Sequence, residues 1–354
     1  DGFDLGVGTL LPFVAKTDEE RRLVLNTIGP VWEGNQVWLI LGGGAIFAAW
    51  PPLYAVSFSG FYLAMFLILF ALILRPVGFK YRGKLQSQRW RDNWDRALFV
   101  GGFVPALIMG VAVGNVLLGV PFHFDDSQRV FYTGSFFGLL TPFALLAGLL
   151  SVAMLVAHGA AMLVLKTDGP VAARASRLGS IAAVASFALF AIGGIWVALG
   201  LPGYAITSQV VTDGASNPLL KTVQITAAGG WMHNYTTMPA TILAPAAGLL
   251  GALAAAVLLR MRRGGLAFLA SGASIAGIIL TVGFALFPFL LPSSSHPGSS
   301  LTAWDASSSH LTLWVMLLVT ALLLPIVIAY TAWVYRVLKG KTTLDEMGGN
   351  PNAY

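Results

Sequence analysis

The chain has 354 residues, of which 56% are hydrophobic and only 10% are charged, and its mean hydropathy is +0.77. Soluble domains carry about 25% charged residues, so this composition predicts an integral membrane protein. The absence of cysteine excludes disulfides, thiolate metal sites and iron–sulfur clusters on this chain. A formal net charge of +6 would suit a nucleic-acid partner, but no nucleic-acid motif accompanies it, and we expect none to bind.

Long apolar runs recur along the whole chain, with no interval between them that could hold a soluble domain. We therefore expect one polytopic, all-α membrane domain over residues 1–354. The run 1–14 is too short to cross a bilayer and opens on Asp, so we expect its helix to begin before the numbered sequence and the total to be about nine helices. Apolar runs that predict full spans lie at 31–50, 52–74, 97–118, 135–165, 179–200, 229–259, 265–291 and 309–335.

The lysines and arginines alternate in the connections between these runs. All of the 21 except Arg129 and Lys221 fall in every second connection or in the C-terminal tail. Because cytoplasmic connections hold most of the basic residues, we expect these connections and the C-terminus to lie in the cytoplasm. This interpretation assigns Arg75 and Lys80 to a cytoplasmic loop. It treats Tyr335, near the end of the last run, as an aromatic anchor at the membrane interface.

Carboxylates beside and within the apolar runs are the most informative residues of the chain. Asp1 and Asp4 lie three residues apart, on one face of a helix, and Asp4 is expected near the middle of the membrane. Glu33 begins the next run, and a short cytoplasmic turn would bring it near the same wall. Acids in a membrane cost about 2.5–3.5 kcal/mol on insertion scales and usually face a partner or a water-filled path. We therefore predict that they form a proton relay.

The residues alone leave two alternatives open for these acids. They could lock helices together through hydrogen bonds to Asn35, Gln36, the backbone or a partner subunit. They could also bind a cation such as Na⁺, because carboxylate and amide oxygens are hard ligands.

Other polar residues give weaker signals. Asn115 could join a polar path, although a single Asn more often pairs with a neighbouring helix. Asp305 and the serines that follow it are predicted to cap the last helix. The histidines do not converge in the sequence, so we expect no metal site on this chain; they are His123, His158, His233, His296 and His310.

Several segments carry a resemblance that spans nearly the whole chain. They are Asp1-Gly2-Phe3-Asp4, Trp32-Glu33-Gly34-Asn35-Gln36-Val37-Trp38, Arg75-Pro76-Val77-Gly78-Phe79, Phe287-Pro288-Phe289 and Leu301-Thr302-Ala303-Trp304-Asp305. With these segments in this order, the chain strongly resembles subunit II of the cytochrome bd-type quinol oxidases.

The resemblance implies a nine-helix subunit of the bacterial cytoplasmic membrane, arranged as two four-helix bundles plus a peripheral helix. It implies a partner, subunit I, that carries the b haems, haem d and the quinol-oxidising loop, while this chain ligates no haem and holds no catalytic residue. The complex would oxidise quinol and reduce O₂ to water with protons from the cytoplasm, and so build a proton-motive force. A small single-helix subunit often accompanies the pair, and some members hold a structural quinone in this subunit.

The resemblance also implies roles for single residues. Glu33 matches the acidic position of a motif associated with a proton channel from the cytoplasm, and Asp1 and Asp4 match the acid pair near that channel. Lys80 departs from the family pattern, where Asp is common, and so weakens a second acidic route there. Our reading is a haem-free oxidase subunit whose Glu33 and Asp4 deliver protons, with Asn35 and Gln36 beside them. A cation-coupled secondary transporter is the main rival, and a purely structural scaffold is the third option.

Overall fold

The apolar runs form the helices of the structure, a computed structural model that describes residues 2–212 and 214–343. Short strands in the connections form antiparallel pairs, β1 with β2, β3 with β4 and β5 with β6. The helices are α1 (Gly2–Val14), α2 (Asp18–Ile28), α3 (Trp32–Ala49), α4 (Pro51–Gly60), α5 (Tyr62–Tyr81), α6 (Gln88–Leu118), α7 (Pro142–Lys166), α8 (Gly169–Gly200), α9 (His233–Thr237), α10 (Leu243–Arg260), α11 (Gly264–Leu286) and α12 (His310–Val337). The strands are β1 (Phe122–Phe124), β2 (Val130–Tyr132), β3 (Pro202–Ile206), β4 (Val223–Ala228), β5 (Phe289–Leu291) and β6 (Leu301–Thr302).

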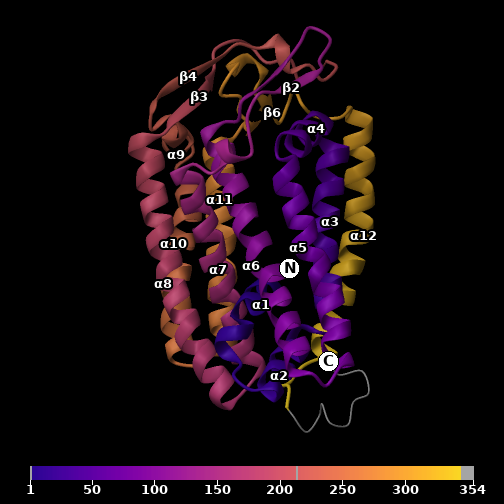
Figure 1. Ribbon diagram of the computed structural model, residues 1–354. Helices are drawn as coiled ribbons and strands as arrows, with labels where there is room; N and C mark the ends of the chain where they lie inside the picture. Colours follow the sequence, from indigo (N-terminus) through magenta and orange to yellow (C-terminus); the bar gives the residue numbers. More distant parts are fainter. Residues whose placement is uncertain (1, 213, 344–354) are drawn as a thin grey trace.

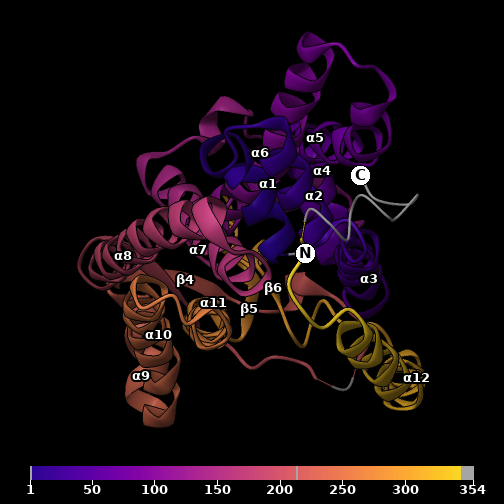
Figure 2. The same cartoon turned by 90° about the horizontal axis from the view of Figure 1, so that it is seen from below.

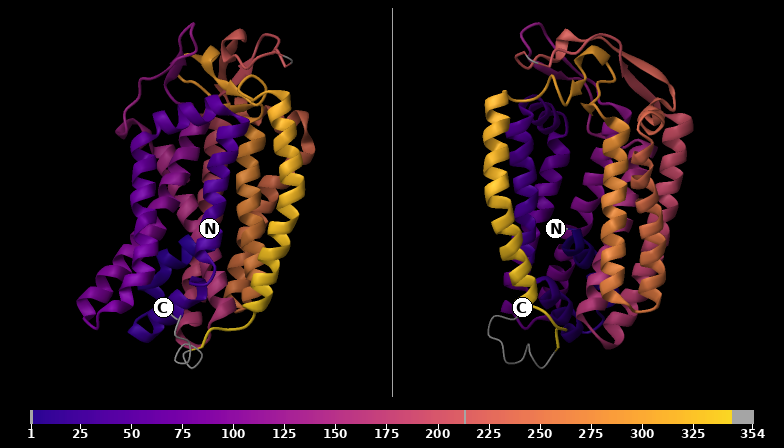
Figure 3. Two further views of the ribbon diagram at one scale, coloured as in Figure 1. Left: turned by 90° about the vertical axis from the view of Figure 1, so that its right-hand side faces the viewer. Right: turned by 180° about the vertical axis from the view of Figure 1, so that it is seen from behind.

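The long helices run side by side between two different ends of the molecule (Figure 1). All the strands gather at one end, the strand end. The other end, the basic end, contains α2 and the α5–α6, α7–α8 and α10–α11 connections. Seen from the basic end, α1 lies among α2, α6 and α7, whereas α12 lies at the edge (Figure 2). In the two views of Figure 3, α12 runs along the outside of the bundle, and none of its residues is buried.

Seven helices of the described part are long and apolar enough to cross a membrane. They are α5, α6, α7, α8, α10 with the short turn before it, α11 and α12. α1 has 13 residues and α3 has 18, and neither is among the seven. An all-α, multi-pass membrane fold is therefore confirmed. The total of nine spans and their division into two four-helix bundles plus a peripheral helix stay predictions.

Proline and capping residues move several helix boundaries away from the predicted runs. The run 52–74 is broken, because Pro51 and Pro52 start the short helix α4 at the strand end, and the membrane helix α5 begins only at Tyr62. The predicted span 135–165 starts instead at Pro142, where Thr141 accepts a hydrogen bond from the Ala144 amide. Residues 229–242 form short turns and α9 rather than the start of a span.

The connection between α1 and α3 is a helix rather than the short turn that we expected. Thr17 and Glu20 form a capping box, in which the Thr17 hydroxyl accepts from the Glu20 amide and the Glu20 carboxylate accepts from the Thr17 amide. A second contact ties α2 to α8, since Arg174 Nη2 donates to Glu20 Oε1 at 2.5 Å. Burial acts to raise the pKa of Glu20, but the bond from Arg174 and the Lys16 and Thr17 amides outweigh it and lower that pKa.

Small residues allow α1 to sit deep between α6 and α7. A Cβ atom on Gly6 would lie 1.9 Å from the Leu155 carbonyl oxygen of α7, and one on Gly102 of α6 would lie 2.6 Å from the Leu5 carbonyl oxygen. Close backbone approach at small residues is typical of helices in membranes. This packing carries Asp4 into the interior of the bundle, where it is 1% exposed.

At the strand end, Asp305 holds two connections together instead of capping α12. Its Oδ1 accepts from the Thr302 amide at 3.0 Å, and its Oδ2 lies 2.6 Å from the Lys221 ammonium. Both side chains are at most 5% exposed. Burial lowers the pKa of Lys221, against the opposing effect of Asp305. The predicted cap is correct for the serines, because Ser309 accepts from the Thr312 amide at the start of α12.

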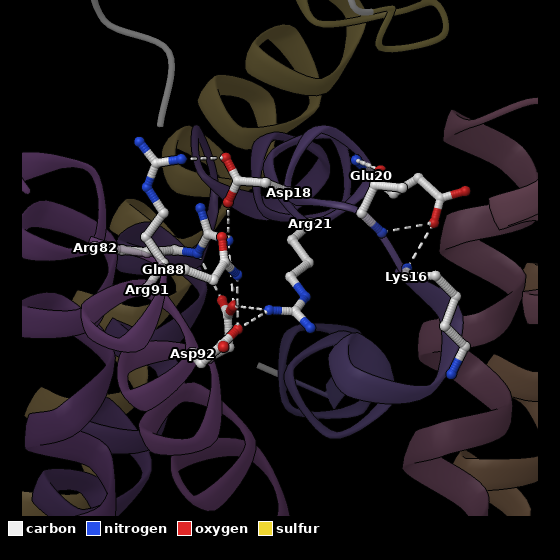
Figure 4. Close-up of polar contacts among 10 residues, drawn as sticks. Lys16, Asp18, Glu20, Arg21, Arg82, Gln88, Arg91 and Asp92 are labelled. Carbon is white, nitrogen blue, oxygen red and sulfur yellow. Dashed lines mark hydrogen bonds and ion pairs between the residues drawn. The ribbon is translucent and has the colours of Figure 1, made fainter. Parts of the chain in front are cut away.

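At the basic end, a network of ion pairs joins α2 to α6 and to the 3-10 turn Arg82–Lys84 that follows α5 (Figure 4). Asp95 accepts from Arg82 Nε at 2.6 Å and from Arg21 Nη1 at 2.9 Å. Asp18 pairs with Arg82 and with Arg91, each at 2.7 Å. Arg82 and Asp95 are at most 5% exposed, so the network fixes the position of α2 below α1.

Candidate functional site

The candidate site is built around Asp4, a buried carboxyl group on α1. Its Oδ2 accepts a hydrogen bond of 2.7 Å from Asn35 Nδ2, which belongs to the first turns of α3. The sequence placed both residues in a common polar cluster, and the structure brings these two together. An acid that is 1% exposed among apolar helices needs such partners, since an unpaired buried charge is very unfavourable.

Tyr335 of α12 completes the contacts of the Asn35 amide. Its hydroxyl donates to Asn35 Oδ1 at 3.1 Å, so the two ends of the amide are fixed by different helices. Asn35 therefore links α12 to α1 through Asp4. We predicted that Tyr335 is an aromatic anchor at the membrane interface. That prediction did not include its bond to Asn35, a residue 300 positions away in the chain.

Arg75 is the residue of the site that our sequence analysis missed. It lies in α5 and is 3% exposed, not in a cytoplasmic loop as the charge pattern suggested. Its guanidinium carbon lies 5.6 Å from the centre of the Trp32 ring, which stacks on Phe79 at 5.0 Å. The positive charge of Arg75 attracts the Asp4 carboxylate electrostatically. A Cβ on Gly101 would lie 2.9 Å from Arg75 Cγ, so that glycine provides the space for the buried arginine.

Three buried polar atoms around this cluster have no hydrogen-bond partner among the described residues. They are Asp4 Oδ1, Trp32 Nε1 and Gln36 Oε1. Trp32 and Gln36 are four residues apart on α3, so they share the face of the helix that also carries Asn35. Buried polar atoms normally find a partner, and an ordered water molecule often supplies it. These atoms therefore offer both a donor and acceptors to water.

The other predicted acids are not brought to Asp4 by any described contact. Glu33 is exposed on the outer side of α3, whereas Asn35 and Gln36 are half-buried. Asp1 lies outside the described residues. That Glu33 lies near the same wall as Asp4 stays a prediction.

The histidines of the described residues form neither a metal site nor an evident haem site. No group of three His, Cys, Asp or Glu side chains there could hold a metal ion. His158 Nδ1 lies 2.8 Å from Ser271 Oγ inside the bundle. The rings of His123 and His296 meet at the strand end, with their centres 4.6 Å apart and their planes tilted by 39°. Asn115 bonds to the carbonyls of Val111 and Leu139, as a packing residue does.

Comparisons with known proteins agree along the chain. The family model for cytochrome bd terminal oxidase subunit II matches residues 1–338. The chain is 47% identical to subunit 2 of the cytochrome bd-I ubiquinol oxidase of Escherichia coli strain K12, over 100% of this chain and 93% of that protein. It is 48% identical to a probable cytochrome oxidase subunit 2 of Haemophilus influenzae, with the same coverage. The fold is similar to the bd oxidase structure from Geobacillus thermodenitrificans, with a TM-score of 0.64 and 12% identity over 96% of this chain and 94% of that one.

Proposed function

The chain belongs to the cytochrome bd terminal oxidase subunit II family, and from this premise we propose that it supports a haem-bearing subunit I and delivers protons to it through Asp4. The membership itself makes the chain part of a quinol oxidase complex in a bacterial inner membrane. In the proposal, haems b and d and the quinol-oxidising site lie on subunit I, where O₂ is reduced to water. This chain then holds no catalytic residue and contributes to the proton-motive force by the direction of proton uptake.

The observation that carries the proposal is the environment of Asp4. One of its oxygens is held by Asn35, and the other is buried without a protein partner among the described residues. Burial makes the charged form of Asp4 unfavourable, and the positive charge of Arg75 acts in the opposite direction. An acid held in this way inside a membrane protein is a typical proton relay group. Gln36 has a free acceptor next to this path, and Glu33 and Asp1 are proposed as further acids along it.

Two helices with exposed apolar faces, α3 and α12, support the part of the proposal that concerns a partner subunit. None of the residues of α12 is buried, and on α3 only Trp32 and Ala49 are. Glu33 lies on this exposed surface of α3, where contact with subunit I would give the carboxylate a polar environment. We include a small single-helix subunit in the proposal because of the family resemblance alone. No contact among the described residues supports a structural quinone.

The orientation in the proposal follows from the basic residues. The basic end carries Lys16, Lys84 and Arg262 in connections and Arg89 in the first turn of α6, all on exposed positions. Under the positive-inside rule this end, with the C-terminus, faces the cytoplasm. Protons would then approach Asp4 from the basic end.

The test is oxidase turnover of the purified complex with substitutions at the acids. Asp4→Asn keeps the shape of the side chain and removes the ionisable group, so turnover falls while the haem content stays at the wild-type level. Glu33→Leu serves the same purpose at the exposed acid, and Asp126→Asn, on an exposed turn at the strand end, is the matched control. Loss of haem together with turnover would mean that the acids are structural. Cation-driven uptake by this chain reconstituted alone would instead support a transporter.

A further inference from the structure

Four exposed arginines lie together on one side of the basic end, and we call them the arginine corner. They are Arg177 of α8, Arg260 at the end of α10, and Arg262 and Arg263 in the connection to α11. Figure 2 shows α8, α10 and α11 on one side of the bundle, away from the α5–α6 connection. None of the four arginines forms an ion pair with a carboxylate of the described residues.

This lack of acidic partners distinguishes the arginine corner from the rest of the basic end. Several basic residues there do pair with described acids, namely Arg21, Arg82, Arg91, Arg174 and Lys341. The positive-inside rule explains basic residues in a cytoplasmic connection, but it does not explain missing acids, because Asp and Glu contribute little to that rule. Neighbouring positive charges repel each other, so the corner is favourable for an anion from outside the chain.

A side-chain hydrogen bond places Arg260 across the boundary between α8 and α10. Its Nε donates to Ser180 Oγ at 3.2 Å, and the Ser180 hydroxyl donates in turn to the Ala256 carbonyl at 2.9 Å. Arg177 lies three residues before Ser180, on the same side of α8. The Nη groups of Arg260 make no hydrogen bond to the described residues. The boundary between the two helices therefore carries arginines from both of them.

Arg262 has a backbone conformation that favours glycine. Its φ is 55°, at the position that follows the end of α10. The Arg262 and Arg263 amides donate to the Leu259 and Leu258 carbonyls, each at 2.9 Å, and these are the two bonds of a Schellman motif. Glycine is usual at this position because a Cβ atom is crowded there. The Arg262 side chain is exposed and unpaired among the described residues, so the fold itself gains little from an arginine here.

Exposed apolar side chains continue from the arginine corner along both helices. Ile181 lies four residues after Arg177 on α8, and Val257 and Leu253 lie three and seven residues before Arg260 on α10. These spacings put the apolar side chains on the same helix face as the arginine. The predicted apolar runs begin at 179 and end at 259, so both arginines lie just outside them, at the depth of lipid headgroups.

We propose that the arginine corner binds the headgroup phosphate of an anionic phospholipid, whose acyl chains lie along the exposed apolar faces of α8 and α10. Guanidinium groups suit this ligand because they can donate two parallel hydrogen bonds to one phosphate. A zwitterionic lipid brings its own cation, so a corner without acids selects a lipid with a net negative charge. This inference goes beyond the proposed function and does not depend on the role of Asp4.

The experiment measures lipid binding to the intact oxidase complex, purified with its partner and stripped of lipid in detergent. Phosphatidylglycerol is the anionic probe, phosphatidylcholine is the zwitterionic probe, and inorganic phosphate tests for a site that binds the free ion. Native mass spectrometry over a series of lipid concentrations gives the number of bound lipids and their dissociation constants. Haem content and the yield of assembled complex show that each variant is folded.

The variants separate the arginine corner from general charge attraction at the same end. Arg177→Gln and Arg260→Gln each remove one charge, whereas Arg260→Lys keeps the charge and loses the planar group. Lys84→Gln is the matched control, because Lys84 is an exposed cation of the basic end that lies outside the corner.

Under the inference, phosphatidylglycerol binds the wild type more tightly than phosphatidylcholine does, and each Arg→Gln variant weakens its binding about fivefold. Arg260→Lys loses less than Arg260→Gln, and Lys84→Gln matches the wild type. Equal weakening by Lys84→Gln would mean that the lipid responds to the charge of the whole end, and the inference would be wrong. Unchanged binding in both Arg→Gln variants, equal binding of the two lipids, or displacement of the lipid by millimolar inorganic phosphate would also overturn it.

Discussion

Burial should decide how strongly each acid of the basic-end network stabilises the fold, and Asp95 and Asp92 provide a matched pair. Asp95 is 5% exposed and accepts three bonds, two from Arg82 at 2.6 and 3.2 Å and one from Arg21 at 2.9 Å. Asp92 lies on the same helix and also accepts from Arg21, but its side chain is 38% exposed. Breaking a buried ion pair costs about 3–5 kcal/mol, whereas an exposed pair contributes about 0–1 kcal/mol.

We therefore expect Asp95→Asn to destabilise the protein by about 3–5 kcal/mol, because buried Arg82 then keeps only Asp18 as a charged partner, and the new amide NH₂ group faces its guanidinium. Asp92→Asn should cost no more than about 1 kcal/mol. The assay is thermal unfolding of the purified complex, followed by tryptophan fluorescence. A double substitution, Arg82→Met with Asp95→Leu, removes both charges and should recover much of the loss. Equal destabilisation by Asp92→Asn and Asp95→Asn would refute the reasoning from burial.

Three further outcomes follow from the contacts. Lys221→Met leaves Asp305 buried without its cation and should lower the unfolding temperature sharply, whereas replacing both with apolar residues should restore most of it. The pKa of Glu20 in the folded protein is held below its ordinary value of 4.5. The ionised Glu20 therefore stabilises the fold above that pH, and this contribution disappears as the pH falls through the lower pKa of the folded state. The difference in unfolding free energy between wild type and Glu20→Gln should accordingly be smaller at about pH 3 than at about pH 7. Gly6→Ala should disrupt the packing of α1 and reduce the yield of assembled complex, while Gly34→Ala, which has open space around it, should leave that yield unchanged.

Sequence patterns predicted the membrane fold because long apolar runs have few alternatives to membrane helices. They also placed Asp4 and Asn35 in one polar cluster. The boundaries of the runs were less certain, since an apolar stretch such as 229–242 can form turns at the strand end as well as a helix. The α2 helix carried a readable signal, the Thr17-to-Glu20 capping box, which our interpretation of a short turn passed over.

The rest of the candidate site depends on contacts that local patterns do not carry. Arg75 stands at the end of an apolar run among other basic residues, so its charge is typical of a loop. Its burial depends on contacts between distant residues: the Arg75 side chain packs beside Gly101 of α6, and its guanidinium lies over the Trp32 ring of α3. Tyr335 meets Asn35 across 300 residues, and a tyrosine near the end of a span normally indicates an interface anchor.

The contacts of Asp4 also bear on the alternatives that the sequence left open. A carboxylate that only locks helices together would be expected to have both oxygens engaged, but Asp4 Oδ1 has no described partner. A cation site would need several oxygen ligands turned inward. Here Asn35 presents its Nδ2 to Asp4 while its oxygen accepts from Tyr335, and the positive charge of Arg75 would repel a bound cation. An acid with one fixed oxygen, one open oxygen and a positive neighbour can instead exchange a proton, because only the charge of Asp4 has to change while its surroundings stay in place.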